Sequence, residues 1–253
     1  MFTLMRNLRR NLIESNSMGK YILYAFGEVL LIVVGILAAL WIDNWNQERQ
    51  EAKREQFYLS GLKDEFEASL LKLDTLMAVN RKSYETAGQL LRQIPKASIQ
   101  DEADISKMLI GALTYEIAYN PNNSLLMELI SSGRLETFSS AELRKHLTSW
   151  DSFLESVHRQ ESNLRAQRQH AQDLLRGPEG SIMTIAVYTG VASEMDLIRD
   201  GNLYSNLTLL KSREFENNLL LFTLEAMNME SVHYQPLRKE IETILGLIET
   251  SME

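Results

Sequence analysis

Glu28 is the residue whose type and setting most strongly suggest chemistry. It is the one charged residue in the apolar run 21–42, YILYAFGEVLLIVVGILAALWI. A charged carboxylate inside a hydrocarbon layer costs on the order of a few kcal/mol, so we expect Glu28 to be protonated, paired or in contact with water. Two interpretations stay open: a proton or ion site, or a structural hydrogen bond to Tyr24 one turn back or across an oligomer.

A repeated hexapeptide, ESVHxQ, supplies the second candidate site. It begins at Glu155 and again at Glu230, so that His158 and His233 each follow a glutamate by three residues. Two such E-x-x-H pairs are half the ligand set of a di-iron helical bundle, with Glu65 and Glu85 as conceivable further ligands. The apolar stripes argue against this site, because Glu155 and His158 lie beside the first stripe. On the second helix His233 falls on the stripe and Glu230 is offset from it.

Small residues in the apolar run could form a helix-packing interface. Gly35 and Ala39 are four residues apart, and Gly27 lies two turns before Gly35 on nearly the same face. Small residues at this spacing let two membrane helices approach closely, which favours self-association.

Composition excludes several classes of site. The chain has 253 residues and no cysteine, which excludes disulfides, thiolate metal sites and cysteine nucleophiles. Its net charge of −8 argues against nucleic-acid binding by the whole chain. No phosphate-binding loop, nucleophile elbow or dinucleotide fingerprint is present, so the sequence indicates no enzyme, no cofactor and no small-molecule substrate.

The run 21–42 predicts one transmembrane helix. Its 22 residues give about 33 Å of helix, enough to cross a hydrocarbon core of about 30 Å. Tyr21 and Tyr24 stand at one end and Trp41 and Trp45 near the other, as interfacial aromatics do. Four basic residues precede the run and three follow closely, a bias that favours a cytoplasmic amino terminus and a periplasmic remainder, anchored in the inner membrane.

The remaining sequence predicts long amphipathic helices. Apolar or small residues recur every three or four positions from Leu59 to Ile94, and Pro95 ends this seam. We expect long helices at about 45–94, 140–176 and 205–249, with Pro236 kinking the last one. Ser139 and Glu142 have the spacing of a capping box before the second helix. Residues 178–204 form the least regular stretch.

Two blocks of the sequence resemble a known family. The block 19–49, GKYILYAFGEVLLIVVGILAALWIDNWNQER, and the block 129–135, LISSGRL, are similar to an uncharacterised domain-of-unknown-function family of single-pass membrane proteins common in Bacteroidota. Members show a GE pair in the span, here Gly27-Glu28, and a WN pair after it, here Trp45-Asn46. The resemblance implies a small membrane-anchored helical protein and supplies no activity.

The sequence therefore predicts an all-α protein in three parts: a basic segment 1–20, a transmembrane helix 21–42 and a helical-bundle or coiled-coil-like domain 43–253. We expect a membrane-anchored interaction or scaffold protein of an envelope complex, partnered by the lipid bilayer and by a second copy or another membrane protein. The alternative is an ion- or proton-coupled accessory subunit acting through Glu28. A third, weaker hypothesis is the di-metal bundle.

Overall fold

The computed structural model describes residues 18–94, 101–197 and 203–253, without the side chains of 18–21 and Tyr24. Every regular element in these ranges is a helix, and no strand occurs among them. The chain divides into the units Met1–Phe57 and Tyr58–Glu253, which are described separately below. Most of the predicted basic segment, residues 1–17, lies outside the described ranges.

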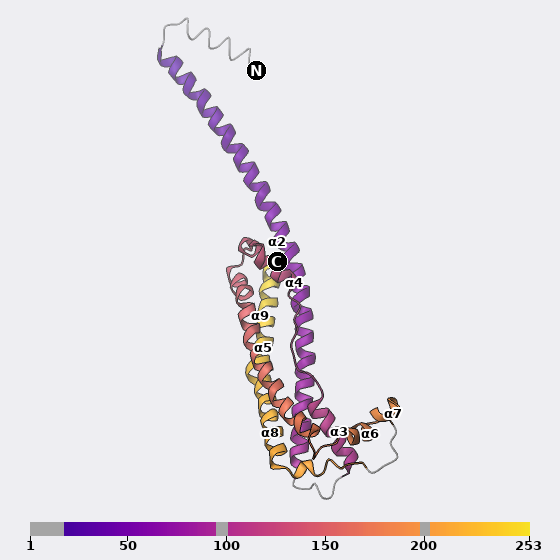
Figure 1. The fold of residues 1–253 in the computed structure, drawn as a ribbon. Helices are drawn as coiled ribbons and strands as arrows, with labels where there is room; N and C mark the ends of the chain where they lie inside the picture. Colours follow the sequence, from indigo (N-terminus) through magenta and orange to yellow (C-terminus); the bar gives the residue numbers. More distant parts are fainter. Residues whose placement is uncertain (1–17, 95–100, 198–202) are drawn as a thin grey trace. The chain divides into compact units, whose positions relative to one another are not determined.

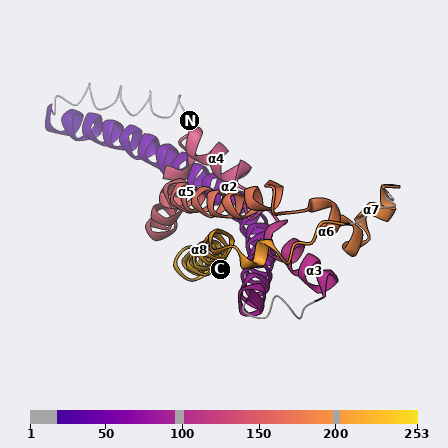
Figure 2. The same cartoon turned by 60° about the horizontal axis from the view of Figure 1, so that its bottom comes forward.

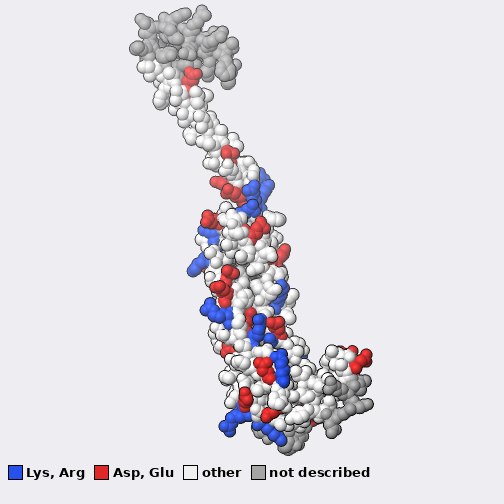
Figure 3. Space-filling view, viewed as in Figure 1, with Lys and Arg blue, Asp and Glu red and all other residues white. Residues whose placement is uncertain are grey.

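Helix α2 (Met18–Gln93) supplies all the described structure of the first unit. Apolar side chains from Ile22 to Trp45 are exposed along this part of the helix. An 18-residue stretch of this helix has a mean hydropathy of 2.5, and none of that stretch is buried. The helix is therefore long and apolar enough to cross a membrane. Figure 3 shows this part of α2 as a surface with few charged residues.

The second unit is built on three helical layers that lie side by side (Figure 1). They are the later part of α2, helix α5 (Ala141–Arg176), and the line formed by α8 (Arg213–Asn228) and α9 (Gln235–Met252). Helix α5 packs against both α8 and α9. The core includes large apolar residues from all of these helices: Leu59, Leu62, Phe66, Leu73, Leu147, Trp150, Leu154, Phe215, Leu219, Phe222, Leu237, Ile241, Ile244 and Ile248.

Shorter helices complete the second unit. They are α3 (Glu102–Leu113), α4 (Ser124–Ser131), η2 (Arg134–Thr137), α6 (Ile182–Thr189), α7 (Val191–Glu194) and η3 (Leu209–Lys211). Figures 1 and 2 show α3, α6 and α7 grouped at one end of the bundle. Thus the stretch 178–204, expected to be irregular, contains two helices, and residues 198–202 lie outside the described ranges.

Local sequence explains where these helices begin. The hydroxyl of Ser140 accepts a hydrogen bond from the Leu143 amide and caps α5, so the predicted cap at Ser139 is wrong by one residue. Ser212 caps α8 in the same way. The last long helix therefore begins at Arg213 instead of about 205, and the hydroxyl of Ser205 binds Glu102 of α3 instead.

A π-helix, η4 (Met229–Tyr234), joins α8 to α9. Buried residues before it follow three- and four-residue steps up to Met229, and the next fully buried apolar residue is Tyr234, five positions on. A π turn contains one residue more than an α turn and shifts the buried stripe by that residue. The expectation that His233 lies on the stripe and Glu230 beside it is therefore wrong: Tyr234 and Glu230 are buried, and His233 is only half-buried.

Candidate functional site

Glu28, Gly27, Gly35 and Ala39 are all exposed in the first unit. A Cβ atom built at Gly27 or Gly35 would meet no atom within 4 Å. The face on which the small residues lie is therefore open in the single chain.

The residues of the two E-x-x-H pairs do not gather into a metal-binding group among the described residues. Glu155 is exposed on α5, and the Nε2 atom of His158 lies 3.2 Å from the Tyr119 carbonyl oxygen. Glu230 is buried and forms an ion pair with Arg81 of α2. No group of three or more His, Asp or Glu residues that could hold a metal occurs in the described ranges.

The further ligands considered for a metal are also placed elsewhere. Glu65 accepts hydrogen bonds from the amides of Leu125 and Leu126, at 2.7 and 3.2 Å, and so caps helix α4. Glu85 is exposed on α2. The ESVHxQ repeat nevertheless marks the right region, because Glu161 follows its first copy directly and Tyr234 belongs to its second.

Glu161 of α5 is the centre of a buried polar cluster, with a side chain only 3% exposed. Its Oε1 atom accepts a hydrogen bond from the Tyr234 hydroxyl at 2.6 Å and another from the Tyr119 amide at 2.7 Å. The Tyr119 hydroxyl in turn donates to the Ser69 carbonyl of α2 at 3.0 Å. We call Glu161, Tyr119, Tyr234 and Ser69 the polar cluster. It joins α2, α5, η4 and the segment after α3.

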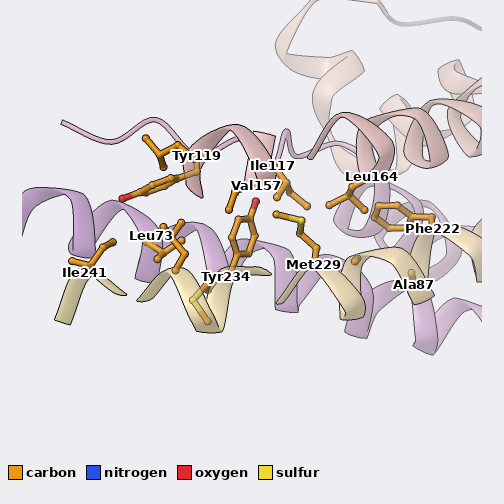
Figure 4. Packing of buried hydrophobic residues seen from close by; sticks show 14 of the residues in the cluster. Leu73, Ala87, Ile117, Tyr119, Val157, Leu164, Phe222, Met229, Tyr234 and Ile241 are labelled. Atoms are coloured by element: carbon orange, nitrogen blue, oxygen red, sulfur yellow. The ribbon is translucent and has the colours of Figure 1, made fainter. Parts of the chain in front are cut away.

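The surroundings of the polar cluster are apolar. Figure 4 shows Tyr119 and Tyr234 among Leu73, Val157 and Met229. Burial raises the pKa of the Glu161 carboxyl, although its hydrogen bonds to Tyr234 and Tyr119 act in the opposite direction. Burial, together with the nearby Glu161 charge, also raises the pKa of Tyr234, so this phenol stays protonated and remains a hydrogen-bond donor.

The segment after α3 is held to α2 by a second set of bonds. The Ser69 hydroxyl donates to the Asn122 carbonyl at 3.1 Å and accepts from the Asn122 amide at 2.8 Å. The Lys72 ammonium donates to the Asn120 carbonyl at 3.1 Å and to the Asn122 side chain. A segment without regular structure is thus fixed by side chains of the neighbouring helix.

A further group of polar residues joins α2 to α8 and to η4. Asn80 donates to the Ala226 carbonyl at 2.9 Å, and Arg81 binds Glu230 one helical turn further on. The Oδ1 atom of Asn80, the hydroxyl of Ser83 and the Oε2 atom of Glu230 are buried without a hydrogen-bond partner in the structure.

The polar cluster cross-links four segments of the second unit. Two surface cavities, of about 640 and 220 Å³, are lined by other residues of the second unit, and Glu161 contributes to neither. The carboxylate is instead occupied by groups of its own chain, which join four segments. Buried hydrogen bonds of this kind favour one packing arrangement over its alternatives.

A signal for Glu161 was present in the sequence. The apolar stripe of α5 runs through Leu154 and Val157 and resumes at Leu164, which leaves position 161 as a gap on the buried face. A glutamate at a buried position needs hydrogen-bonding partners. Its partners could not be found in the same way, because the π turn that brings Tyr234 to it has no simple sequence signature.

Comparison with known proteins identifies a family and no relative of known activity. No curated protein and no solved structure matches the chain. A family of unknown function, DUF6090, matches residues 28–156, a range that begins at Glu28 and ends within α5. Because the match extends over more than half of the sequence, the chain belongs to the DUF6090 family of unknown function.

Proposed function

We propose that this protein is a membrane-anchored scaffold, whose apolar part of α2 crosses a lipid bilayer and whose second unit binds partner proteins. The observation that carries the proposal is the complete exposure of the apolar window of α2. Soluble proteins rarely expose a continuous apolar surface of this extent, because water penalises it. A bilayer removes that penalty, since an α-helix satisfies its own backbone hydrogen bonds there.

The second unit supports the scaffold role through its rigidity. Its buried carboxylate, phenols and amide groups bond mainly to one another across helices, as the polar cluster shows. Such internal bonding holds long helices in one arrangement and leaves their outer faces available to partners.

The proposed orientation places the amino terminus in the cytoplasm and the second unit in the periplasm, with the anchor in the inner membrane. Arg6, Arg9, Arg10 and Lys20 precede the span, whereas Arg49, Lys53 and Arg54 follow it. Under the positive-inside rule the more basic side remains cytoplasmic.

Fractionation and labelling of cells that express the full chain test this proposal. We expect the protein to remain in membranes after alkaline carbonate washing and to be extracted by detergent. The chain has no cysteine, so Ser152→Cys on α5 and Asn11→Cys before the span give two single labelling sites. A membrane-impermeant thiol reagent should label Cys at 152 in cells with a permeabilised outer membrane, and Cys at 11 only after lysis. The reverse labelling pattern would show the opposite topology. Release of the protein by carbonate would refute the membrane anchor.

Glu28 supports a second candidate function, an ion- or proton-coupled accessory subunit. It is an exposed carboxylate in the otherwise uncharged apolar run. Glu28→Gln keeps the shape and the hydrogen-bonding capacity but removes titration, whereas Glu28→Leu removes polarity altogether. If Glu28 only joins helices, Gln should preserve the complex and Leu should weaken it by about 0.6–2 kcal/mol. Loss of cellular function in the Gln variant, with the complex intact, would instead support coupling.

A further inference from the structure

The outer face of α8 carries an exposed apolar stripe with the spacing of a coiled-coil seam. Leu220, Leu224 and Met227 are 44%, 54% and 49% exposed. Asn217 and Ser231 are also exposed, and Ser231 lies just beyond α8, in η4. The five residues follow alternating steps of three and four residues. This is the a/d pattern of a helix that packs against another helix. We call Asn217, Leu220, Leu224, Met227 and Ser231 the α8 stripe.

The α8 stripe carries no charge, although Arg213, Glu214 and Glu216 at the start of α8 are exposed. The exposed residues in the range 217–232 are the α8 stripe with Leu221, Asn228 and Val232, and none of them is charged. By contrast, the exposed face of α5 carries Glu155 and Arg159. Figure 3 shows charges of both signs spread over the side of the second unit that it presents.

We propose that the α8 stripe binds the α8 stripe of a second copy of this chain, in parallel and in register. In such a pair each residue faces the same residue of the other copy. A charged residue would therefore face a like charge, so this pairing needs an uncharged face. Asn217 fits the same arrangement, because an asparagine at an a position pairs with its counterpart and fixes register.

The pairing of two copies rests on the proposed membrane anchor. Two copies anchored in one bilayer by the same helix cross it in the same direction. Helix α8 has only 16 residues, so the contact is short. Confinement to one membrane raises the effective concentration of the two copies and allows a short contact to hold.

Single cysteines in the full chain, oxidised in native membranes, test the pairing directly. Asn217→Cys, Leu224→Cys and Ser231→Cys should each form a disulfide-linked dimer. An antiparallel pair centred on Leu224 would link only through Cys at 224, and that result would overturn the proposal. Ser156→Cys, at an exposed position of α5, is the control that should remain monomeric.

A charge at the centre of the stripe gives a second, independent test. In the Ser231→Cys background, either Leu224→Lys or Leu224→Asp should slow cross-linking by about tenfold or more, because like charges would face each other. Co-expression of the Lys and Asp forms with different tags should restore linkage between unlike chains. Leu71→Lys is the matched control: Leu71 is 70% exposed on α2, and its replacement should change nothing.

The outcomes separate this inference from the anchor. Carbonate extraction of the same samples reports on membrane insertion, whereas the covalent products report on the α8 stripe whether or not the chain is in the membrane. Links to other proteins without links between copies, or unchanged linkage in both charge variants, would overturn the pairing.

Discussion

Deletion of a single serine should have opposite consequences in the two ESVHxQ hexapeptides. Ser156 lies in the continuous α-helix α5, and Ser231 lies at the same place of the second copy, in the π-helix η4. Both serines are exposed, so neither deletion removes a core side chain. Each removes one residue, which turns the following part of an α-helix by about 100°.

In α5 this rotation moves core residues out of the core. Val157, Leu164 and Leu175 are at most 8% exposed, and each contributes about 1.5–3 kcal/mol when fully buried. Their loss, of about 4.5–9 kcal/mol before the polar cluster is counted, is comparable with a whole stability of about 5–15 kcal/mol. We expect the Ser156 deletion to abolish cooperative folding.

In η4 the same deletion removes the extra residue. Tyr234 would then follow Met229 by four positions, and Leu237 and Ile241 would follow at three and four, so every buried residue of α9 keeps its face. The disturbance is limited to the π turn and the Arg81–Glu230 pair. We expect the free energy of unfolding to fall by at most about 2 kcal/mol, which lowers Tm by at most about 4–8 °C for a unit of this size.

Thermal unfolding of the full chain in mild detergent, followed by far-ultraviolet circular dichroism, measures both deletions. A cooperative transition in the Ser231 deletion and none in the Ser156 deletion is the expected pair of results. Loss of folding in both would show that the π turn cannot be replaced by an α turn without disrupting the core. Normal folding of the Ser156 deletion would refute the assignment of the α5 stripe to the core.

The remaining predictions concern the polar cluster and the core. Tyr234→Phe should cost about 1.5–3 kcal/mol in chemical denaturation, because it removes a hydrogen bond to a buried carboxylate; the same change at the exposed Tyr115 should cost less than about 0.5 kcal/mol. The pKa of Glu161 is raised in the folded state, so the folded state binds this proton more tightly than the unfolded state. The stabilisation that proton binding gives to the fold is therefore full below the unfolded pKa and is lost as pH rises through the folded pKa. The stability of Glu161→Gln relative to the wild type should therefore increase as pH rises through that window; no change in the difference would contradict the raised pKa. Phe66→Ala should cost about 3–5 kcal/mol and alter the fluorescence of Trp150, whose ring centroid lies 5.0 Å away; a smaller loss with unchanged fluorescence would contradict the edge-to-face contact.

Periodicity predicted the all-helical architecture and the long helices, because the buried faces repeat regularly. In the α2 seam, Leu62, Phe66 and Leu73 are in the core. Ser69 and Ser83 are fully buried, whereas the adjacent apolar residues Leu70 and Tyr84 are only partly buried. Hydrophobicity alone places the larger apolar residue inside. The hydrogen bonds of Ser69 with Asn122 decide otherwise, and they depend on a segment 53 residues away.

The candidate site was less accessible to sequence reasoning. The sequence motifs pair glutamate with histidine, which suits metals, whereas the buried Glu161 pairs with the Tyr234 hydroxyl and the Tyr119 amide. Periodic patterns assume a constant number of residues per turn, and η4 breaks that assumption where Glu230 and Tyr234 enter the core. The same break explains why His233 was placed on the buried face.

Contacts of α2 with α8 and α9 also determine when the second unit can fold. Lys63 binds Glu249, 186 residues later, and Asn80 binds the carbonyl of Ala226, 146 residues later. At about 5–20 residues per second of synthesis, on the order of 10–40 s pass between synthesis of the α2 seam and synthesis of the helices that cover it. Helix α4, eight residues long, is too short to persist alone, and it depends on Glu65 of α2 for its cap. The apolar residues of the α2 seam are therefore synthesised well before the helices that cover them.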